Sequence, residues 1–77
     1  MTSPVAKTKI IANLDFFEAF KHLIYGKKIT KAEWGDENYY GFIESEIVKL
    51  HKSDGSVHNW IISTNDMAGT DWQVIEN

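Results

Sequence analysis

Apolar residues follow the spacing of an α-helix in one stretch of the chain, from Asp15 to Gly26. They recur there at intervals of three and four, which places them on one helical face: Phe16, Ala19, Phe20, Leu23 and Ile24. Asp15 and Glu18 have the spacing of a capping box, and Gly26 suits the end of the helix. The pattern predicts one amphipathic helix that needs a sheet beneath it.

The rest of the chain alternates apolar and polar residues in short segments, as antiparallel strands do. We predict strands at Lys28–Trp34, Tyr39–Lys52, Val57–Ser63 and Asp71–Glu76. The long second strand is expected to bend at Gly41 or Ser45, and residues 64–70 to form a compact loop. One helix on a small antiparallel sheet gives an α+β fold.

The Asp54-Gly55 dipeptide predicts a hairpin, and two pairings of its strands are compatible with the sequence. A two-residue loop would oppose His51 to His58, which could then bind a metal ion. A three-residue loop with a bulge buries a better apolar face, and it is the register that we predict: Val48 opposite Trp60 and Leu50 opposite His58.

Residues 1–13 are expected to be a flexible start or a short edge strand, and residues 14–77 a single ligand-binding domain. A chain of 77 residues buries only about 60% of its unfolded surface, so its stability margin is thin. It has no cysteine for disulfides or thiolate metal sites. Oligomerisation is therefore the expected source of added stability.

Charge and composition exclude several classes of protein. The net charge of −3 argues against binding to polymeric DNA or RNA, which needs many cationic contacts to phosphate. No apolar stretch approaches the roughly 20 residues that span a bilayer. Glu44 and Glu46 lie two apart on a predicted strand, and we interpret them as a solvated face. Without a triad spacing, a phosphate loop or a metal-ligand pair, we expect no enzyme, no metal and no cofactor.

Ligand binding has better support from two parts of the chain. Three lysines precede Trp34, and two tyrosines follow it: Lys27, Lys28 and Lys31, then Tyr39 and Tyr40. Cations beside aromatic rings suit a ligand that carries phosphates and a base. Alternatively, the first two lysines complement the helix end and Trp34 fills the core.

The second part is the loop between Trp60 and Trp72, which is rich in short hydrogen-bonding side chains: Ser63, Thr64, Asn65 and Asp66. Such a loop can offer hydroxyl, amide and carboxylate groups to ribose or an anion. Alternatively, it is a capped helical turn from Asp66 to Gly69, in which Asp66 and Asp71 are structural anchors. Asn65 is the loop residue least needed for a cap.

These motifs together resemble a family of small phage proteins associated with Thoeris anti-defence, as its second type of sponge. The resemblance rests on the ordered motifs Leu14-Asp15-Phe16-Phe17-Glu18-Ala19-Phe20, Gly26-Lys27-Lys28-Ile29, Trp34, Asp54-Gly55, Trp60-Ile61-Ile62-Ser63, Asp66-Met67 and Asp71-Trp72. The chain departs from the family where a basic pair is replaced by Thr30 and Lys31, so that a bidentate arginine fork is missing. It also has Ala68-Gly69 in place of Leu-Ala, and a longer start.

The resemblance implies a non-catalytic homotetramer in the cytoplasm of the bacterial host. It would sequester a cyclic nucleotide-derived immune messenger, glycocyclic ADP-ribose above all, with cyclic oligonucleotides as further ligands. The expected ligand-binding residues are Trp34, Lys31, Thr64, Asn65 and Asp66. The alternative is a small phage module that docks on a protein partner through a sheet edge, with Lys7–Ala12 as the docking strand.

Overall fold

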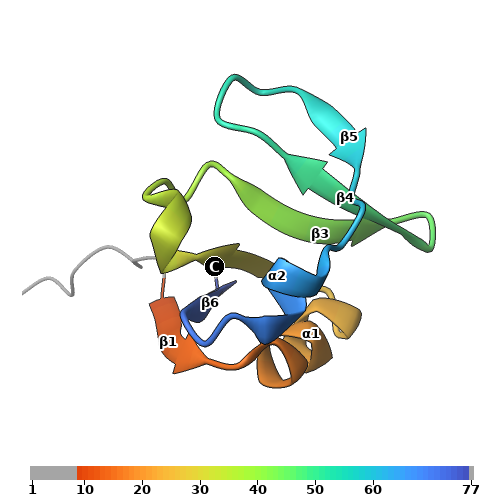
Figure 1. Cartoon of the computed structure of the whole chain (residues 1–77). Coiled ribbons are helices and arrows are strands. Elements are labelled where there is room, and N and C mark those ends of the chain that lie inside the picture. The colour runs from red at the N-terminus through yellow and green to blue at the C-terminus, as the bar shows by residue number, and fades with distance from the viewer. Residues whose placement is uncertain (1–8, 77) are drawn as a thin grey trace, which may run out of the picture.

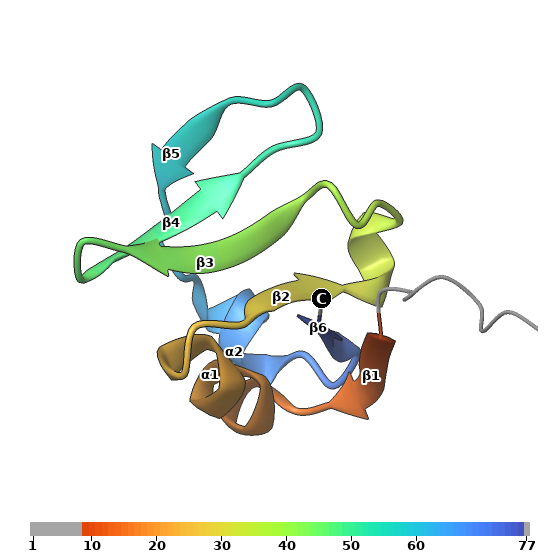
Figure 2. The same ribbon diagram turned by 180° about the vertical axis from the view of Figure 1, so that it is seen from behind.

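A single antiparallel sheet of six strands forms the frame of the protein, with the strand order β1-β6-β2-β3-β4-β5. The computed structural model describes residues 9–76. The strands are β1 (Lys9–Leu14), β2 (Lys28–Lys31), β3 (Tyr40–Glu44), β4 (Ile47–His51), β5 (Val57–Asn59) and β6 (Trp72–Glu76). Two helices, α1 (Phe16–Ile24) and α2 (Thr64–Ala68), and a 3₁₀ turn, η1 (Ala32–Trp34), complete it. The predicted α+β fold is confirmed (Figures 1 and 2).

Helix α1 forms where the apolar stripe predicts it. Asp15 caps its first turn, since the Glu18 N–H donates to Asp15 Oδ1 at 2.8 Å. Phe16, Ala19 and Leu23 are buried against β2 and β6. The chain leaves the helix through Gly26, whose φ of 94° is in the left-handed region that glycine adopts without strain.

The long strand predicted over Tyr39–Lys52 is wrong, because the chain reverses direction completely at Ser45 and Glu46. Their φ values of 53° and 67° are those of a two-residue hairpin turn. The segment therefore forms two strands, β3 and β4, which pair from Tyr40 opposite His51 to Glu44 opposite Ile47. Glu46 lies in the turn and not on a strand, so the shared strand face expected for Glu44 and Glu46 is also wrong.

The preferred register of the second hairpin is confirmed. Leu50 lies opposite His58, and the Trp60 N–H donates to the Val48 carbonyl at 3.0 Å. His51 faces Val57, so the opposed histidine pair does not form. Across residues 9–76 no three or more His, Cys, Asp or Glu side chains are grouped to hold a metal ion.

Two predicted strands end earlier than expected. The first stops at Lys31 and continues as η1, which carries Trp34 back over the sheet. The third stops at Asn59, so Trp60 leads directly into the segment before α2. Both tryptophans thereby join the same core, in which Trp72 is fully buried, together with Leu23, Ile29 and Val74. No helix within the described residues is long and apolar enough to cross a membrane.

Strand β1 lies at one edge of the sheet, antiparallel to β6, with a register shift between Ile11 and Leu14. Strand β5 is the opposite edge. The expected flexible start and the first part of the proposed docking strand, Lys7 and Thr8, lie outside the described residues.

Candidate functional site

An aromatic hollow of about 450 Å³ lies between η1, the β4–β5 hairpin and the start of α2. Its apolar lining consists of Trp34, Tyr39, Leu50, Trp60 and Ile61. Its polar lining consists of Lys52, His58, Asn59, Ser63 and Asp66. A hollow of this size, with aromatic walls and a few polar groups, is typical of sites for small ligands.

Trp34 belongs both to the core and to the wall of this aromatic hollow. Its ring lies 4.4 Å from that of Tyr39, tilted by 35°, and contacts Trp72 edge-on at 5.5 Å. The Trp34 side chain is only half-buried, and it lines the hollow. The two interpretations of Trp34 therefore do not exclude each other, because one side of the residue packs on Trp72 while another is open to a ligand.

Helix α2 begins with a full capping box, three residues earlier than predicted. Ser63, not Asp66, is the N-cap: the Asp66 N–H donates to Ser63 Oγ at 3.0 Å. In return the Ser63 N–H donates to Asp66 Oδ2 at 3.2 Å. The Asp66 carbonyl also accepts the indole N–H of Trp72 at 2.9 Å. Asp66 thus connects α2 to the core and also lines the aromatic hollow.

The remaining predicted residues of the loop do not line the aromatic hollow. Thr64 and Asn65 are exposed on α2 and do not line the aromatic hollow. Asp71 has a structural contact, because its Oδ2 accepts the Glu33 N–H at 2.9 Å and so joins the start of β6 to η1.

Lys31 is a buried cation at the edge of this region, only 3% exposed. Its Nζ lies 3.1 Å from Glu33 Oε1 and 5.4 Å from the centre of the Trp72 ring. The Glu33 side chain is 66% exposed, so the partner of this buried ammonium lies in solvent. The structure therefore brings Trp34 and Asp66 to one hollow and places Lys31 over the Trp72 ring, whereas Thr64 and Asn65 are exposed on α2 and do not line the hollow.

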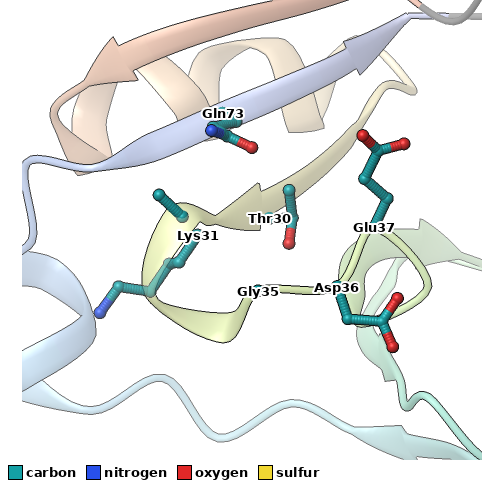
Figure 3. Close-up of a pocket in the computed structure, with 7 residues that line it drawn as sticks. Thr30, Lys31, Gly35, Asp36, Glu37 and Gln73 are labelled. Atoms are coloured by element: carbon teal, nitrogen blue, oxygen red, sulfur yellow. The ribbon is translucent and has the colours of Figure 1, made fainter.

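A second, smaller hollow of about 250 Å³ lies over Thr30 and Gln73, beside Gly35, Asp36 and Glu37 (Figure 3). Lys31 lines it, but its ammonium points to the opposite side from the two carboxylates. Hydrogen bonds from the Ser53 hydroxyl and the Asn38 N–H hold the pKa of Asp36 below its usual range. Two carboxylates line this hollow and its one lysine points away from them, whereas the aromatic hollow combines aromatic rings with Lys52 and a single carboxylate, so the aromatic hollow is the better candidate for a nucleotide-like ligand.

Three polar lining residues of the aromatic hollow were not predicted as ligand-binding residues: Lys52, His58 and Asn59. A signal for His58 was present, because the preferred hairpin register places His58 and Trp60 two apart on one strand face. Lys52 and Asn59 had no such signal, since their approach to η1 depends on how the sheet curves.

The capping box predicts that neighbouring residues of this loop differ in their contribution to stability. Ser63→Ala is expected to lower the free energy of unfolding by about 1 kcal/mol, or the melting temperature by about 4–8 °C. Thr64→Ala and Asn65→Ala remove exposed side chains, and alanine favours a helix, so their melting temperatures should match the wild type. Differential scanning fluorimetry measures all three. Equal losses in all three variants would contradict the observed cap.

Comparison with known families adds to this geometry. The family model of the Thoeris anti-defense 2-like domain matches residues 14–75. The chain belongs to this family. The resemblance predicted from the sequence motifs is thereby confirmed, and membership supports a role in countering Thoeris defence. No curated protein matches the chain. The matched region contains α1, η1, α2 and the whole aromatic hollow, and it begins at the last residue of β1.

Proposed function

We propose that this protein is a non-catalytic sponge that captures a cyclic nucleotide-derived immune messenger, with glycocyclic ADP-ribose as the first candidate. The observation that carries the proposal is the aromatic hollow, which Trp34 and Tyr39 line together with polar groups from the β4–β5 hairpin and α2. It occurs in a chain of the anti-defence family. Capture, with no chemistry on the messenger, would keep it from its effector.

Each part of such a messenger has a matching group in or beside the hollow. A base can stack on Trp34, whose ring is supported from behind by Trp72. Ribose hydroxyls can bond to Asp66 and Ser63, which also line the hollow. Phosphates are complemented by Lys52, which lines the hollow, and by Lys31, which is paired with Glu33.

Assembly into a homotetramer is part of the proposal. Thr64 and Asn65 are exposed beside the hollow, where a second subunit would turn them into ligand contacts. A pocket between subunits encloses a polar ligand on more sides than the monomer does. Effective capture in the host cytoplasm requires a binding free energy of about −9 kcal/mol or better, if the effector responds to submicromolar messenger.

Thermal stability with and without ligand tests the proposal. Glycocyclic ADP-ribose should raise the melting temperature in proportion to the logarithm of its concentration, and linear ADP-ribose should do so much less. Cyclic di- and trinucleotides belong to the same panel. If no member of the panel changes the melting temperature, the binding proposal fails, and docking on a protein partner through a sheet edge becomes the better account.

The Lys31–Glu33 contact gives a further prediction. The Glu33 carboxylate occupies the position that a phosphate would take at the buried ammonium, 3.1 Å from Nζ. Glu33→Gln should therefore raise messenger affinity by about two- to five-fold, the scale of an exposed ion pair. Glu37→Gln is the matched control, since it removes the same charge from a nearby side chain that forms no ion pair with Lys31. Equal affinities of Glu33→Gln and the wild type would show that phosphate does not reach Lys31.

A further inference from the structure

Helix α1 presents a second apolar face that the protein itself does not cover. Its side chains Phe17, Ile24 and Tyr25 are 76%, 61% and 77% exposed. Phe17 and Ile24 are two helical turns apart on the same side of α1, with half-buried Phe20 between them. In both views α1 forms the lower boundary of the molecule, and no other described element lies beyond it (Figures 1 and 2).

The size of this α1 face suits a subunit interface. A buried aromatic side chain covers about 150–250 Å², so the three exposed side chains present on the order of 400 Å² per copy. That matches the largest patches on typical monomers, about 300–600 Å², which often are functional. Two copies in contact would bury about 800 Å² from these side chains alone. The smallest stable interfaces bury roughly 1,200 Å², so rim residues would have to supply about a third of that area.

We propose that α1 packs antiparallel on α1 of a second copy of this chain, about a two-fold axis near the middle of the helix. Such an axis reverses the helix, so Phe17 meets Ile24 of the partner subunit, and the same contact recurs on the other side of the axis. One apolar stripe thereby covers another of the same length.

The charges beside the face support a second copy as the occupant. The charged side chains next to the stripe are Glu18 and Lys21, which form a 3.3 Å ion pair within the helix. They are of opposite sign, so two subunits related by the axis together contribute two glutamates and two lysines, with no net charge. A strongly basic or acidic partner would find no complementary charge on this face. The pairing does not depend on messenger binding, but it supplies one of the interfaces that the proposed tetramer needs.

The oligomeric state of the full chain tests this pairing. By sedimentation equilibrium, Phe17→Lys/Ile24→Lys should associate at least tenfold more weakly than the wild type. Lysine keeps a high helix propensity, so α1 itself should still form. Ile47→Lys is the matched control, since Ile47 is an exposed apolar residue on β4. A wild-type monomer at 100 µM, or a folded double variant that assembles like the wild type, would overturn the proposal.

A crosslink tests the geometry without weakening the apolar contact. The chain has no cysteine, so one introduced thiol can react only with its copy. Lys21→Cys lies beside the proposed axis and should form a disulfide-linked dimer on mild oxidation. Lys27→Cys, beyond the end of α1, should not. Similar crosslinking of both would exclude the antiparallel arrangement. Messenger binding is measured on the same samples, so that its absence in the wild type would contradict the sponge proposal and not this pairing.

Discussion

Trp34→Ala should weaken messenger binding by about 5- to 150-fold, the effect of losing a base stack worth about 1–3 kcal/mol. The ring lines the aromatic hollow and is supported by Trp72 at 5.5 Å and Tyr39 at 4.4 Å. Trp34→Phe keeps a ring for stacking and should lose less affinity. Calorimetry gives the affinities, and fluorimetry shows whether each variant is folded.

Tyr40→Ala is the control for Trp34. Tyr40 is one residue from Tyr39, but it stacks on His51 at 4.6 Å and does not line the aromatic hollow. Its removal should leave the affinity unchanged. If Tyr40→Ala and Trp34→Ala weaken binding equally while both remain folded, the messenger does not bind in this hollow.

Gly41→Ala should lower the free energy of unfolding by about 1–3 kcal/mol, the usual cost of overpacking a core. A Cβ atom at position 41 would lie 2.4 Å from Cζ3 of Trp60, much closer than real contacts allow. Trp60 is buried, so its ring cannot move into solvent without leaving the core. The melting temperature should fall by about 4–8 °C for each kcal/mol.

A double-mutant cycle separates this clash from other effects of the alanine. In a Trp60→Leu background the crowded ring is absent, so Gly41→Ala should cost much less than in the wild type. Full additivity of the two substitutions would show that Trp60 is not the cause. The same substitution should disturb messenger binding, because Trp60 forms one wall of the aromatic hollow.

The sequence predicts those parts of the fold that depend on local spacing. The stripe of α1 and the capping Asp15 are properties of consecutive residues, and both occur as expected. The register of the second hairpin followed from the need to bury Leu50 and Trp60 together. Ser45 was one of the two bends expected in this segment, but the full reversal at Ser45 and Glu46 was missed because neither residue is a glycine or asparagine, the residues that usually mark positive φ.

The candidate site is predicted only in part, because it depends on contacts between distant segments. Trp34 and Asp66 were predicted and line one hollow, although they are far apart in sequence. The burial of Lys31 could not be anticipated, since it follows from its pairing with Trp72 across β2 and β6. The partner subunit that would bring Thr64 and Asn65 to the ligand is likewise invisible in a single chain.

Isothermal titration of the purified protein with glycocyclic ADP-ribose, followed by chromatography of the ligand after heating, tests the central claim most directly. The sponge account predicts a dissociation constant of about 0.3 µM or lower, since capture requires about −9 kcal/mol. It also predicts that the ligand is recovered chemically intact. No heat of binding at high micromolar ligand would contradict capture of this messenger, and its recovery as a converted product would contradict the absence of catalysis.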